Sequence, residues 1–373
     1  MKAKFHIPDI WVHKDLNLYL IDMIKNHPEF FYDDIEIASC YGCFPSALWN
    51  GGRALGGLAL ETQITSTIKA FNDRNVPIRY TFTNPTLTEK DLKDKFCNHL
   101  CAIAENGFNE LIVNKPFLED YVRRNYPKFP LISSTVKQIE DYDQLMEEFK
   151  KDYKLVVLDY NWNNDFEKLD KIPQELRSRV EILINPYCTP HCKRRKQHYE
   201  VLGESQRKCS KQTIYEQLGA VRSVKDPMED ANNFNCPNTR YNFYQITHYS
   251  TFVSNNDVYG RYLDMGFNNF KIEGRVLSKP NVIESYVYYL VKPEYRDRVR
   301  LEMLTHRPQV EEIKAAKEKL MNSAQKLFAK VYEQAQAAQG AAGAQGQAGP
   351  QAGQSASQAG YGDDVVDGDY KEV

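Results

Sequence analysis

Short apolar segments alternate with longer amphipathic segments between residues 35 and 275. The apolar segments are four to seven residues long and end in polar residues; residues 110–113, for example, are followed by Asn114. The segments between them repeat apolar residues at helical spacing, as in residues 89–105. Short apolar strands that alternate with helices are typical of a parallel sheet.

This pattern predicts eight strands in fewer than 280 residues, which matches a closed (β/α)8 TIM-type barrel in count and length. The alternative is an open doubly wound sheet, although no Gly-x-Gly-x-x-Gly sequence follows the first strand. A cysteine-containing insert follows the sixth predicted strand. The strands are expected at residues 35–40, 78–83, 110–113, 131–135, 155–159, 180–184, 250–254 and 269–275, and the helices at residues 16–24, 59–72, 89–105, 116–126, 139–151, 166–176 and 258–265.

The composition narrows the classes of protein. A formal net charge of −2 argues against a globally basic nucleic-acid binder, and 24 Tyr with 18 Phe fit a well-packed core. The N-terminus lacks the apolar run of a secretory signal, and no stretch approaches the length of a membrane span. We therefore expect a cytoplasmic protein without membrane partners. In that compartment the eight cysteines are thiols or metal ligands rather than disulfides.

The predicted strands end in polar residues, and a barrel of this kind carries its active site at the carboxyl ends of its strands. Asn and Asp also favour turns, so each residue taken alone has a simpler explanation. As a set on one face of the barrel they predict a pocket. These residues are Cys40, Asn84, Asn114, Ser134, Asp159, Asn161, Asn185, Asn255, Glu273 and Arg275.

The last predicted strand places Lys271, Glu273 and Arg275 on one face, because side chains alternate along a strand. Isolated buried charge is costly, so these three groups must pair with one another or meet a ligand. We predict that they form the catalytic or substrate-binding group and hold an anion, with Asn114 and Asp159 orienting it. The alternative is a purely structural Lys–Glu–Arg network.

Four cysteines lie between Asn185 and Cys236. Cys188 and Cys192 form a Cys-x-x-x-Cys pair, and Cys209 and Cys236 follow after longer intervals. Four thiolates suit a tetrahedral zinc ion or a 4Fe–4S cluster; the alternative is four free thiols. Cys97 and Cys101 share one face of a predicted helix and are expected to be core thiols.

Basic residues surround these cysteines. The residues are Lys193, Arg194, Arg195, Lys196, Arg207, Lys208 and Lys211. They either attract an anionic or RNA-borne substrate or belong to a solvated loop that offsets thiolate charge, and we favour the loop.

The last strand also resembles a known signature. Residues 270–275 read Phe-Lys-Ile-Glu-Gly-Arg, as in the collagenase-like peptidases, family thirty-two of the unassigned peptidases. Residues 126–135, with their Ser-Thr pair, and residues 185–199, with an Asn-x-x-Cys-x-x-x-Cys segment and a trailing His-Tyr, resemble two further segments of that family in the same order. The resemblance spans roughly residues 35–295.

The resemblance implies a barrel fold. Several members of that family are iron–sulfur proteins that support oxygen-independent hydroxylation in ubiquinone biosynthesis or on RNA bases, despite the peptidase name. By resemblance, Cys188, Cys192, Cys209 and Cys236 are the cluster ligands. Proteolysis is the weaker expectation, since no Ser/His/Asp or Cys/His set stands out in the chain.

The composition changes after residue 307. Residues 308–337 keep helical spacing, whereas residues 338–373 are rich in Ala, Gly and Gln, end in acidic residues and bury too little to fold. Residues 311–373 resemble the extreme C-terminus of the bacterial heat-shock chaperone DnaK, which implies a flexible acidic tether for a protein partner. The alternative is a solubilising appendage or a gene fusion.

Two main hypotheses for function follow. The first is a metal-centre barrel enzyme that hydroxylates or otherwise modifies a small molecule or RNA base. The second is a zinc-stabilised, non-catalytic binding module whose tail recruits a partner. A metal-dependent peptidase is the third.

Overall fold

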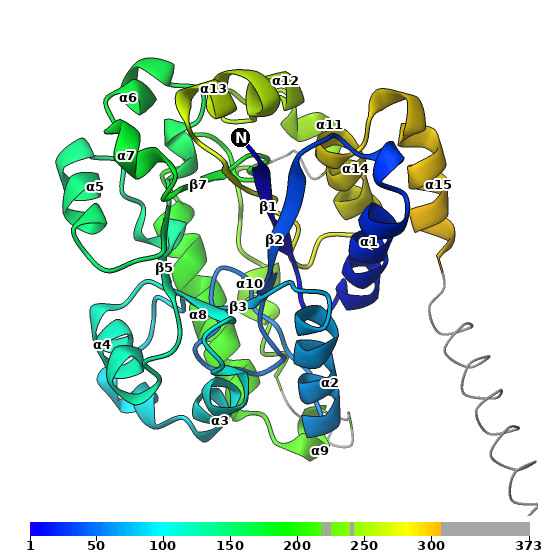
Figure 1. The fold of residues 1–373 in the computed structure, drawn as a ribbon. Coiled ribbons are helices and arrows are strands. Elements are labelled where there is room, and N and C mark those ends of the chain that lie inside the picture. The colour runs from blue at the N-terminus through cyan, green and yellow to red at the C-terminus, as the bar shows by residue number, and fades with distance from the viewer. Residues whose placement is uncertain (218, 220–224, 239–241, 307–373) are drawn as a thin grey trace, which may run out of the picture. The chain divides into compact units, whose positions relative to one another are not determined.

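A closed barrel of eight parallel strands forms the framework of the protein in the computed structural model (Figure 1). The structure describes residues 1–217, 219, 225–238 and 242–306. The strands pair in chain order, and β8 closes the barrel against β1. They are β1 (Ala3–Pro8), β2 (Ile35–Gly42), β3 (Ile78–Phe82), β4 (Glu110–Val113), β5 (Leu131–Ser133), β6 (Leu155–Val157), β7 (Val180–Leu183) and β8 (Asn269–Lys271).

The predicted (β/α)8 barrel is confirmed, but two of its strands were assigned wrongly. Residues 3–8 form β1, which pairs with β2 and β8, although the sequence pattern did not single them out. Residues 250–254 form no strand, because β7 pairs directly with β8 and leaves no place between them. The cysteine-containing insert consequently follows the seventh strand of the barrel and not the sixth.

Helices surround the barrel and connect its strands (Figure 1). Several begin at an acidic cap, as where the Asp94 side chain accepts a hydrogen bond from the Cys97 N–H at the start of α3. The α-helices are α1 (Lys14–Asn26), α2 (Glu61–Asn72), α3 (Lys95–Ala104), α4 (Pro116–Asn125), α5 (Tyr142–Phe149), α6 (Phe166–Asp170), α7 (Gln174–Arg177), α8 (Arg195–Lys211), α9 (Ile214–Gln217), α10 (Glu229–Asn232), α11 (Phe243–Ile246), α12 (Asn255–Asp257), α13 (Leu263–Met265), α14 (Lys279–Leu290) and α15 (Arg296–Thr305). Single turns are η1 (Pro28–Phe30), η2 (Glu89–Lys93), η3 (Thr135–Lys137), η4 (Tyr160–Trp162), η5 (Val258–Tyr262) and η6 (Pro293–Tyr295).

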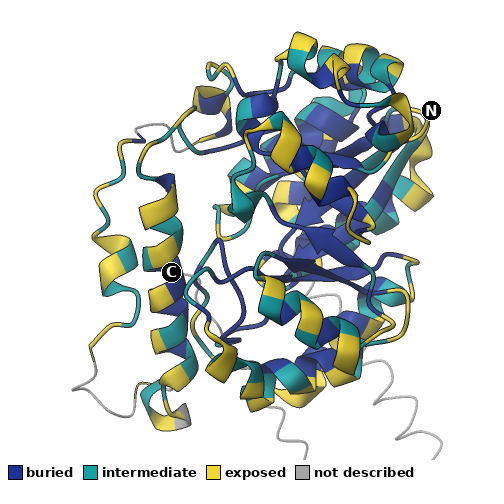
Figure 2. Cartoon of the chain, turned by 90° about the vertical axis from the view of Figure 1, so that its left-hand side faces the viewer, coloured by how far each residue is buried: buried dark blue, intermediate teal, exposed yellow. Residues whose placement is uncertain are grey.

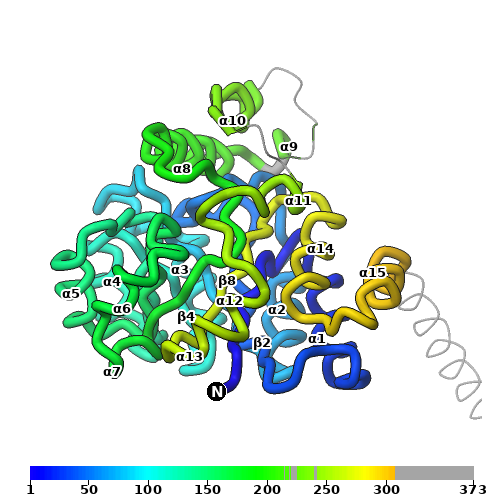
Figure 3. Tube along the Cα trace, turned by 90° about the horizontal axis from the view of Figure 1, so that it is seen from above, coloured from blue at the N-terminus to red at the C-terminus, as the bar shows by residue number. Residues whose placement is uncertain are grey.

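Helix α8 was not predicted, although its 17 residues make it the longest described helix. Its buried residues include Arg195, Gly203 and Gln206, so it lacks the apolar stripe by which a helix is recognised. Figure 3 shows α8 and α10 on the side of the barrel opposite the N-terminus of the chain. Because β1 begins at that N-terminus, α8 and α10 lie over the carboxyl ends of the strands.

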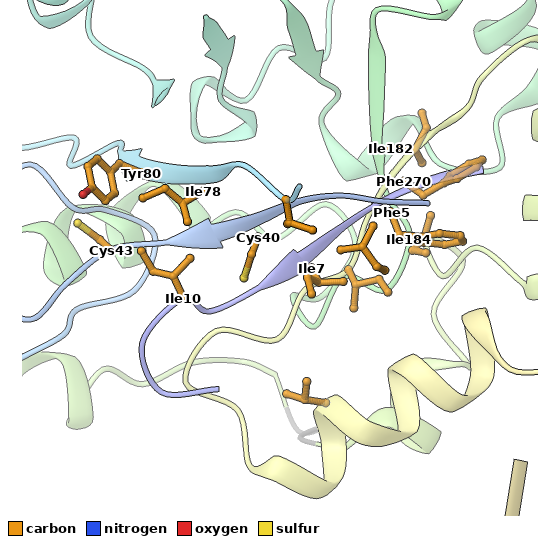
Figure 4. Packing of buried hydrophobic residues seen from close by; sticks show 14 of the residues in the cluster. Phe5, Ile7, Ile10, Cys40, Cys43, Ile78, Tyr80, Ile182, Ile184 and Phe270 are labelled. Atoms are coloured by element: carbon orange, nitrogen blue, oxygen red, sulfur yellow. The ribbon is translucent and has the colours of Figure 1, made fainter. Parts of the chain in front are cut away.

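Both faces of the barrel strands are buried (Figure 2). The outer face packs against the helices through residues such as Phe5, Ile182 and Phe270, which lie close together in Figure 4. Burying each such side chain contributes about 1.5–3 kcal/mol. Inside the barrel a second apolar cluster contains Tyr41, Ile112, Ile132, Leu155 and Val157.

The described residues belong to a unit that comprises Met1–His306. The predicted helix of residues 308–337 and the acidic tail of residues 338–373 lie outside the described residues. None of the described helices has the length and apolar character needed to cross a bilayer.

Candidate functional site

A cavity of about 330 Å³ opens at the carboxyl ends of the barrel strands. Its apolar wall includes Ile112, Val157, Leu183 and Leu202, from three strands and α8. Four tyrosines also line it: Tyr41, Tyr160, Tyr187 and Tyr199. A mostly apolar concave site with a few polar groups is the usual form of a small-molecule site.

A buried ionic layer crosses the barrel interior beside this cavity. Arg79 of β3 donates to Glu110 of β4 and to Glu181 of β7, and all three side chains are almost completely buried. Glu181 also accepts a hydrogen bond of 3.0 Å from Lys271 Nζ. Burial raises the pKa of Glu181, but Lys271 and Arg79 outweigh it and hold that pKa well below its usual value. Glu181 is therefore ionised.

Lys271 joins this ionic layer to the cavity. Its Nζ lies 3.9 Å from the centre of the Tyr41 ring, and both residues line the cavity. Burial lowers the pKa of Lys271 to about 8, because the charged amine loses its hydration. An amine with this pKa can exchange a proton near neutral pH.

Glu273 is held in an ion pair with Arg53, a residue of the loop between β2 and α2. The second oxygen of Glu273 accepts a hydrogen bond of 3.0 Å from the Tyr187 N–H. The Asn185 side chain forms two hydrogen bonds with the backbone of Glu273. Its Nδ2 donates to the Glu273 oxygen at 3.0 Å, and its Oδ1 accepts from the Glu273 N–H at 2.6 Å. Glu273 therefore lines the cavity with its charge already balanced.

Arg275 differs from the other cations of the cavity wall because its hydrogen bonds go to neutral groups. Nη1 donates to Asn50 Oδ1 at 3.2 Å and to Thr81 Oγ1 at 2.8 Å, and Nη2 donates to the Gly51 oxygen at 2.9 Å. Burial lowers the pKa of Arg275. Among the described residues no carboxylate forms an ion pair with it.

Asp159 and Asn114, which the sequence placed in the site, do not line the cavity. Asp159 accepts a hydrogen bond of 2.5 Å from Arg195, which does line it, so Asp159 acts on the cavity through Arg195. Burial raises the pKa of Asp159 although Arg195 opposes the shift. The buried Oδ1 atom of Asn114 accepts no hydrogen bond from any described residue.

Arg53 and Arg195 line the cavity, but sequence reasoning did not assign them to the site. Arg53 follows two glycines in the loop after β2, and Arg195 belongs to the basic run that we interpreted from the sequence as a solvated loop. Arg195 is instead almost completely buried. No local signal distinguishes it from its exposed neighbour Lys196.

The four cysteines of the insert are only partly brought together. Cys188 and Cys236 line the cavity. Burial raises the pKa of Cys188 to about 11, and Cys192 lies close enough to Cys188 to contribute to this rise. Cys209 contacts Met228, with the two sulfur atoms 3.9 Å apart, and lies against Gly56. Among the described residues no three His, Cys, Asp or Glu side chains are arranged to hold a metal ion.

The remaining cysteines are Cys40, Cys43, Cys97 and Cys101, and all four are buried free thiols. Cys97 and Cys101 pack in the core between α3 and the barrel, as the sequence predicted.

A Ser–His–Glu arrangement exists in the barrel, but a substrate has no access to it. His6 Nδ1 lies 2.8 Å from Ser39 Oγ, and His6 Nε2 lies 3.5 Å from Glu181. Each of these side chains is at most 1% exposed, and none lines the cavity. This arrangement therefore does not support a peptidase site.

Hydrogen bonds along its length hold helix α8 over the cavity. Near its C-terminal end Arg207 donates two hydrogen bonds, of 2.7 and 2.9 Å, to Asp91. Near its middle the Gly203 oxygen accepts a hydrogen bond of 3.1 Å from Asn84. At its first residue Arg195 binds Asp159. These contacts make α8 a fixed wall of the cavity.

The Asp91–Arg207 pair predicts an acid-sensitive attachment of α8. The hydrogen bonds from Arg207 lower the pKa of Asp91 to about 2. Because the pKa is lower in the folded protein than in the unfolded chain, the stabilisation is present at neutral pH and is lost as the pH falls from about 4 to about 2. We expect Asp91→Asn to lower the free energy of unfolding at pH 7 by about 1–2 kcal/mol. Below pH 2 we expect the variant and the wild type to have the same free energy of unfolding.

Urea titrations of both proteins from pH 7 down to pH 2 measure this effect. Asp230→Asn is the matched control, because Asp230 pairs with Lys208 of the same helix but is exposed. The control is expected to unfold like the wild type. A difference between Asp91→Asn and wild type that persists unchanged at pH 2 would contradict the assignment.

Comparisons with known proteins gave a match to a family model and a match to a solved structure. The family model of Peptidase family U32 matches residues 53–341. A solved structure described as "The Structure of the U32 Peptidase Mk0906" superposes with a TM-score of 0.40 at 10% sequence identity, over 58% of this chain and 84% of that one.

Proposed function

This chain belongs to peptidase family U32, as the sequence predicted, and from that membership and the cavity we propose that it is an enzyme that modifies a small molecule or an RNA-borne base. The reaction we propose is an oxygen-independent hydroxylation or a related modification. One observation carries the proposal: Cys188 and Cys236 line the same cavity as Lys271 and Arg275. Potential metal-binding thiols and charged groups thus face one enclosed volume.

The chemistry of the four thiols fits a 4Fe–4S cluster or zinc, but their arrangement does not. Both centres take four thiolates, and Cys188, Cys192 and Cys236 lie at or beside the cavity. Cys209 faces Met228 and Gly56 instead. A four-thiolate centre would require Cys209 to change position.

The side chains of the chain itself can bind and orient a planar substrate. The tyrosines and the apolar wall exclude water and offer faces on which a ring can stack. Lys271 can donate or accept a proton at the cavity floor. The Arg53–Glu273 pair presents a fixed, neutral polar group.

Metal analysis of the anaerobically purified protein tests the proposal. We expect iron and sulfide with a broad absorbance near 400 nm, and we expect Cys188→Ala to lose most of the iron. Cys97→Ala is the control, because Cys97 is a buried core thiol away from the cavity, and it is expected to keep its iron.

The Cys209→Ala variant tests the ligand set. Loss of iron in this variant would mean that Cys209 moves to the other three thiols when a cluster binds. Retention of iron would assign a centre to Cys188, Cys192 and Cys236 alone. About one zinc without iron would favour the non-catalytic module, and absence of both metals from the wild type would refute the metal-centre proposal.

A further inference from the structure

We propose that Arg275 and Lys271 form a subsite for the carboxylate of a planar carboxylic acid bound in the cavity. The inference deepens the proposed function, since it names a class of ligand for the same cavity. It rests on the proposed function in one respect: the cavity must be a substrate site. The geometry of the two cations and the charge balance of the cavity wall carry it.

Two N–H groups of the Arg275 guanidinium form no hydrogen bond with any described residue. A guanidinium carries five N–H groups, and its described hydrogen bonds use two on Nη1 and one on Nη2. The Nε–H and the second Nη2–H form no bond with any described residue. These two nitrogens lie on one edge of the guanidinium, which is the edge that can bind both oxygens of a carboxylate.

The charge of Arg275 is also unmatched. The other described cations that line the cavity each have a carboxylate: Glu273 for Arg53, Asp159 for Arg195 and Glu181 for Lys271. Asp9 acts on the pKa of Arg275, but its own oxygens accept hydrogen bonds from the backbone N–H groups of residues 11, 12 and 276. Arg275 is half-buried and has no carboxylate partner among the described residues, so an anionic ligand would balance its charge.

Lys271 and Arg275 converge on one aromatic ring. Lys271 Nζ lies 3.9 Å and the Arg275 guanidinium carbon 5.8 Å from the centre of the Tyr41 ring. Lys271 donates one described hydrogen bond, to Glu181, and an ammonium has three donors. An anion beside Tyr41 can therefore interact with both cations at once.

A carboxylate fits this subsite better than a phosphate does. One unmatched positive charge balances a monoanion, whereas a phosphate monoester carries nearly two negative charges at neutral pH. The rest of the cavity wall is largely apolar and aromatic, which suits a planar hydrophobic body. The ligand class is therefore an aromatic or similarly flat carboxylic acid.

Gly52 keeps the space beside the guanidinium open. A Cβ atom at this position would lie 2.8 Å from Arg275 Nη2, and Gly52 has a φ of +74° that other residues rarely adopt. Gly52 also lines the cavity. A side chain here would occupy the position that the carboxylate takes.

Binding of benzoate to the full-length protein, measured by isothermal titration calorimetry at pH 7, tests the subsite. Benzamide is the neutral probe of the same shape, and phenyl phosphate is the phosphate probe. We expect benzoate to bind at least tenfold more tightly than benzamide and more tightly than phenyl phosphate. Equal affinities for benzoate and benzamide would overturn the proposal, and tighter binding of phenyl phosphate would overturn the choice of a carboxylate.

Two variants at Arg275 and one control locate the effect. Arg275→Gln is expected to weaken benzoate binding at least tenfold, and Arg275→Lys, which keeps the charge but loses the two-donor edge, to weaken it less. Arg300→Gln is the control, because Arg300 of α15 already pairs with Glu284 and Asp297, and it is expected to bind like the wild type. Unchanged affinity in a folded Arg275→Gln protein would refute the assignment; if that variant does not fold, unchanged affinity in Arg275→Lys would refute it.

This experiment and the metal analysis fail independently. Benzoate binding is read from heat and does not depend on colour, iron or sulfide. Benzoate binding without any metal would preserve the subsite and refute the metal-centre enzyme. A cluster without benzoate binding would do the reverse.

Discussion

Replacing Arg79 with methionine is expected to lower the free energy of unfolding by about 3–5 kcal/mol, the largest single effect that we predict. Arg79 is 1% exposed and donates to both Glu110 and Glu181. Its removal leaves two buried carboxylates with one cation each, the half-exposed Lys154 for Glu110 and the buried Lys271 for Glu181. The loss of the guanidinium that both buried carboxylates share costs more than the lost hydrogen bonds. Urea denaturation followed by tryptophan fluorescence measures the loss.

The matched control is again Arg300→Gln, now in a stability measurement. Arg300 also pairs with two carboxylates, but its side chain is 28% exposed, so water replaces the lost partner. This variant is expected to lose less than about 1 kcal/mol. If Arg79→Met also lowers the free energy of unfolding by less than about 1 kcal/mol, water reaches the ionic layer inside the barrel.

Replacing Gly51 with alanine is expected to destabilise the protein by about 3 kcal/mol and to abolish benzoate binding. A Cβ atom at Gly51 would lie 2.3 Å from the carbonyl carbon and oxygen of Thr83 and 2.4 Å from the Asn84 nitrogen. These are backbone atoms, so they cannot rotate away as a side chain would. The loop must move, and it then withdraws the Gly51 oxygen that accepts a hydrogen bond from Arg275.

Gly260→Ala separates this clash from the general effect of replacing glycine. In the part of the chain that the structure describes, no atom lies within 4 Å of a Cβ built at Gly260, which belongs to the helical turn η5. The control is expected to be neutral or to gain about 0.5–1 kcal/mol, because alanine loses less conformational entropy on folding. Thermal unfolding and the benzoate titration are measured on both variants. A Gly51→Ala protein with wild-type stability would show that the loop does not approach β3 as closely as described.

Much of the fold was predictable because its pattern is local. The runs at residues 110–113 and 180–184 are short, mostly apolar and followed by Asn, and β4 (Glu110–Val113) and β7 (Val180–Leu183) form there. β1 was missed because it begins two residues from the N-terminus, where no preceding helix marks a unit. Residues 250–254 have the composition of a strand, but pairing of β7 with β8 excludes them from the sheet.

The candidate site was predictable only in part. The alternation of Lys271, Glu273 and Arg275 predicted that the three share one face, and all three line the cavity. Their partners were not predictable, because Glu273 pairs with Arg53, 220 residues earlier, and Lys271 pairs with Glu181, 90 residues earlier. The same pattern is compatible with a catalytic group and with a structural ion network, and in the structure Glu273 and Lys271 each belong to an ion pair.

The sequence by itself determined the barrel, the family and the shared face of the three charged residues at and just after β8, because hydrophobic period, element count and a short motif are properties of neighbouring residues. Only the tertiary structure decided which charges are balanced. Lys271 and Glu273 have counter-charges from distant strands and loops, whereas Arg275 has neutral partners. The tertiary structure also placed Cys209 apart from Cys188, since Cys209 lies near the far end of the 17-residue helix α8, which follows Cys188 and Cys192 in the chain.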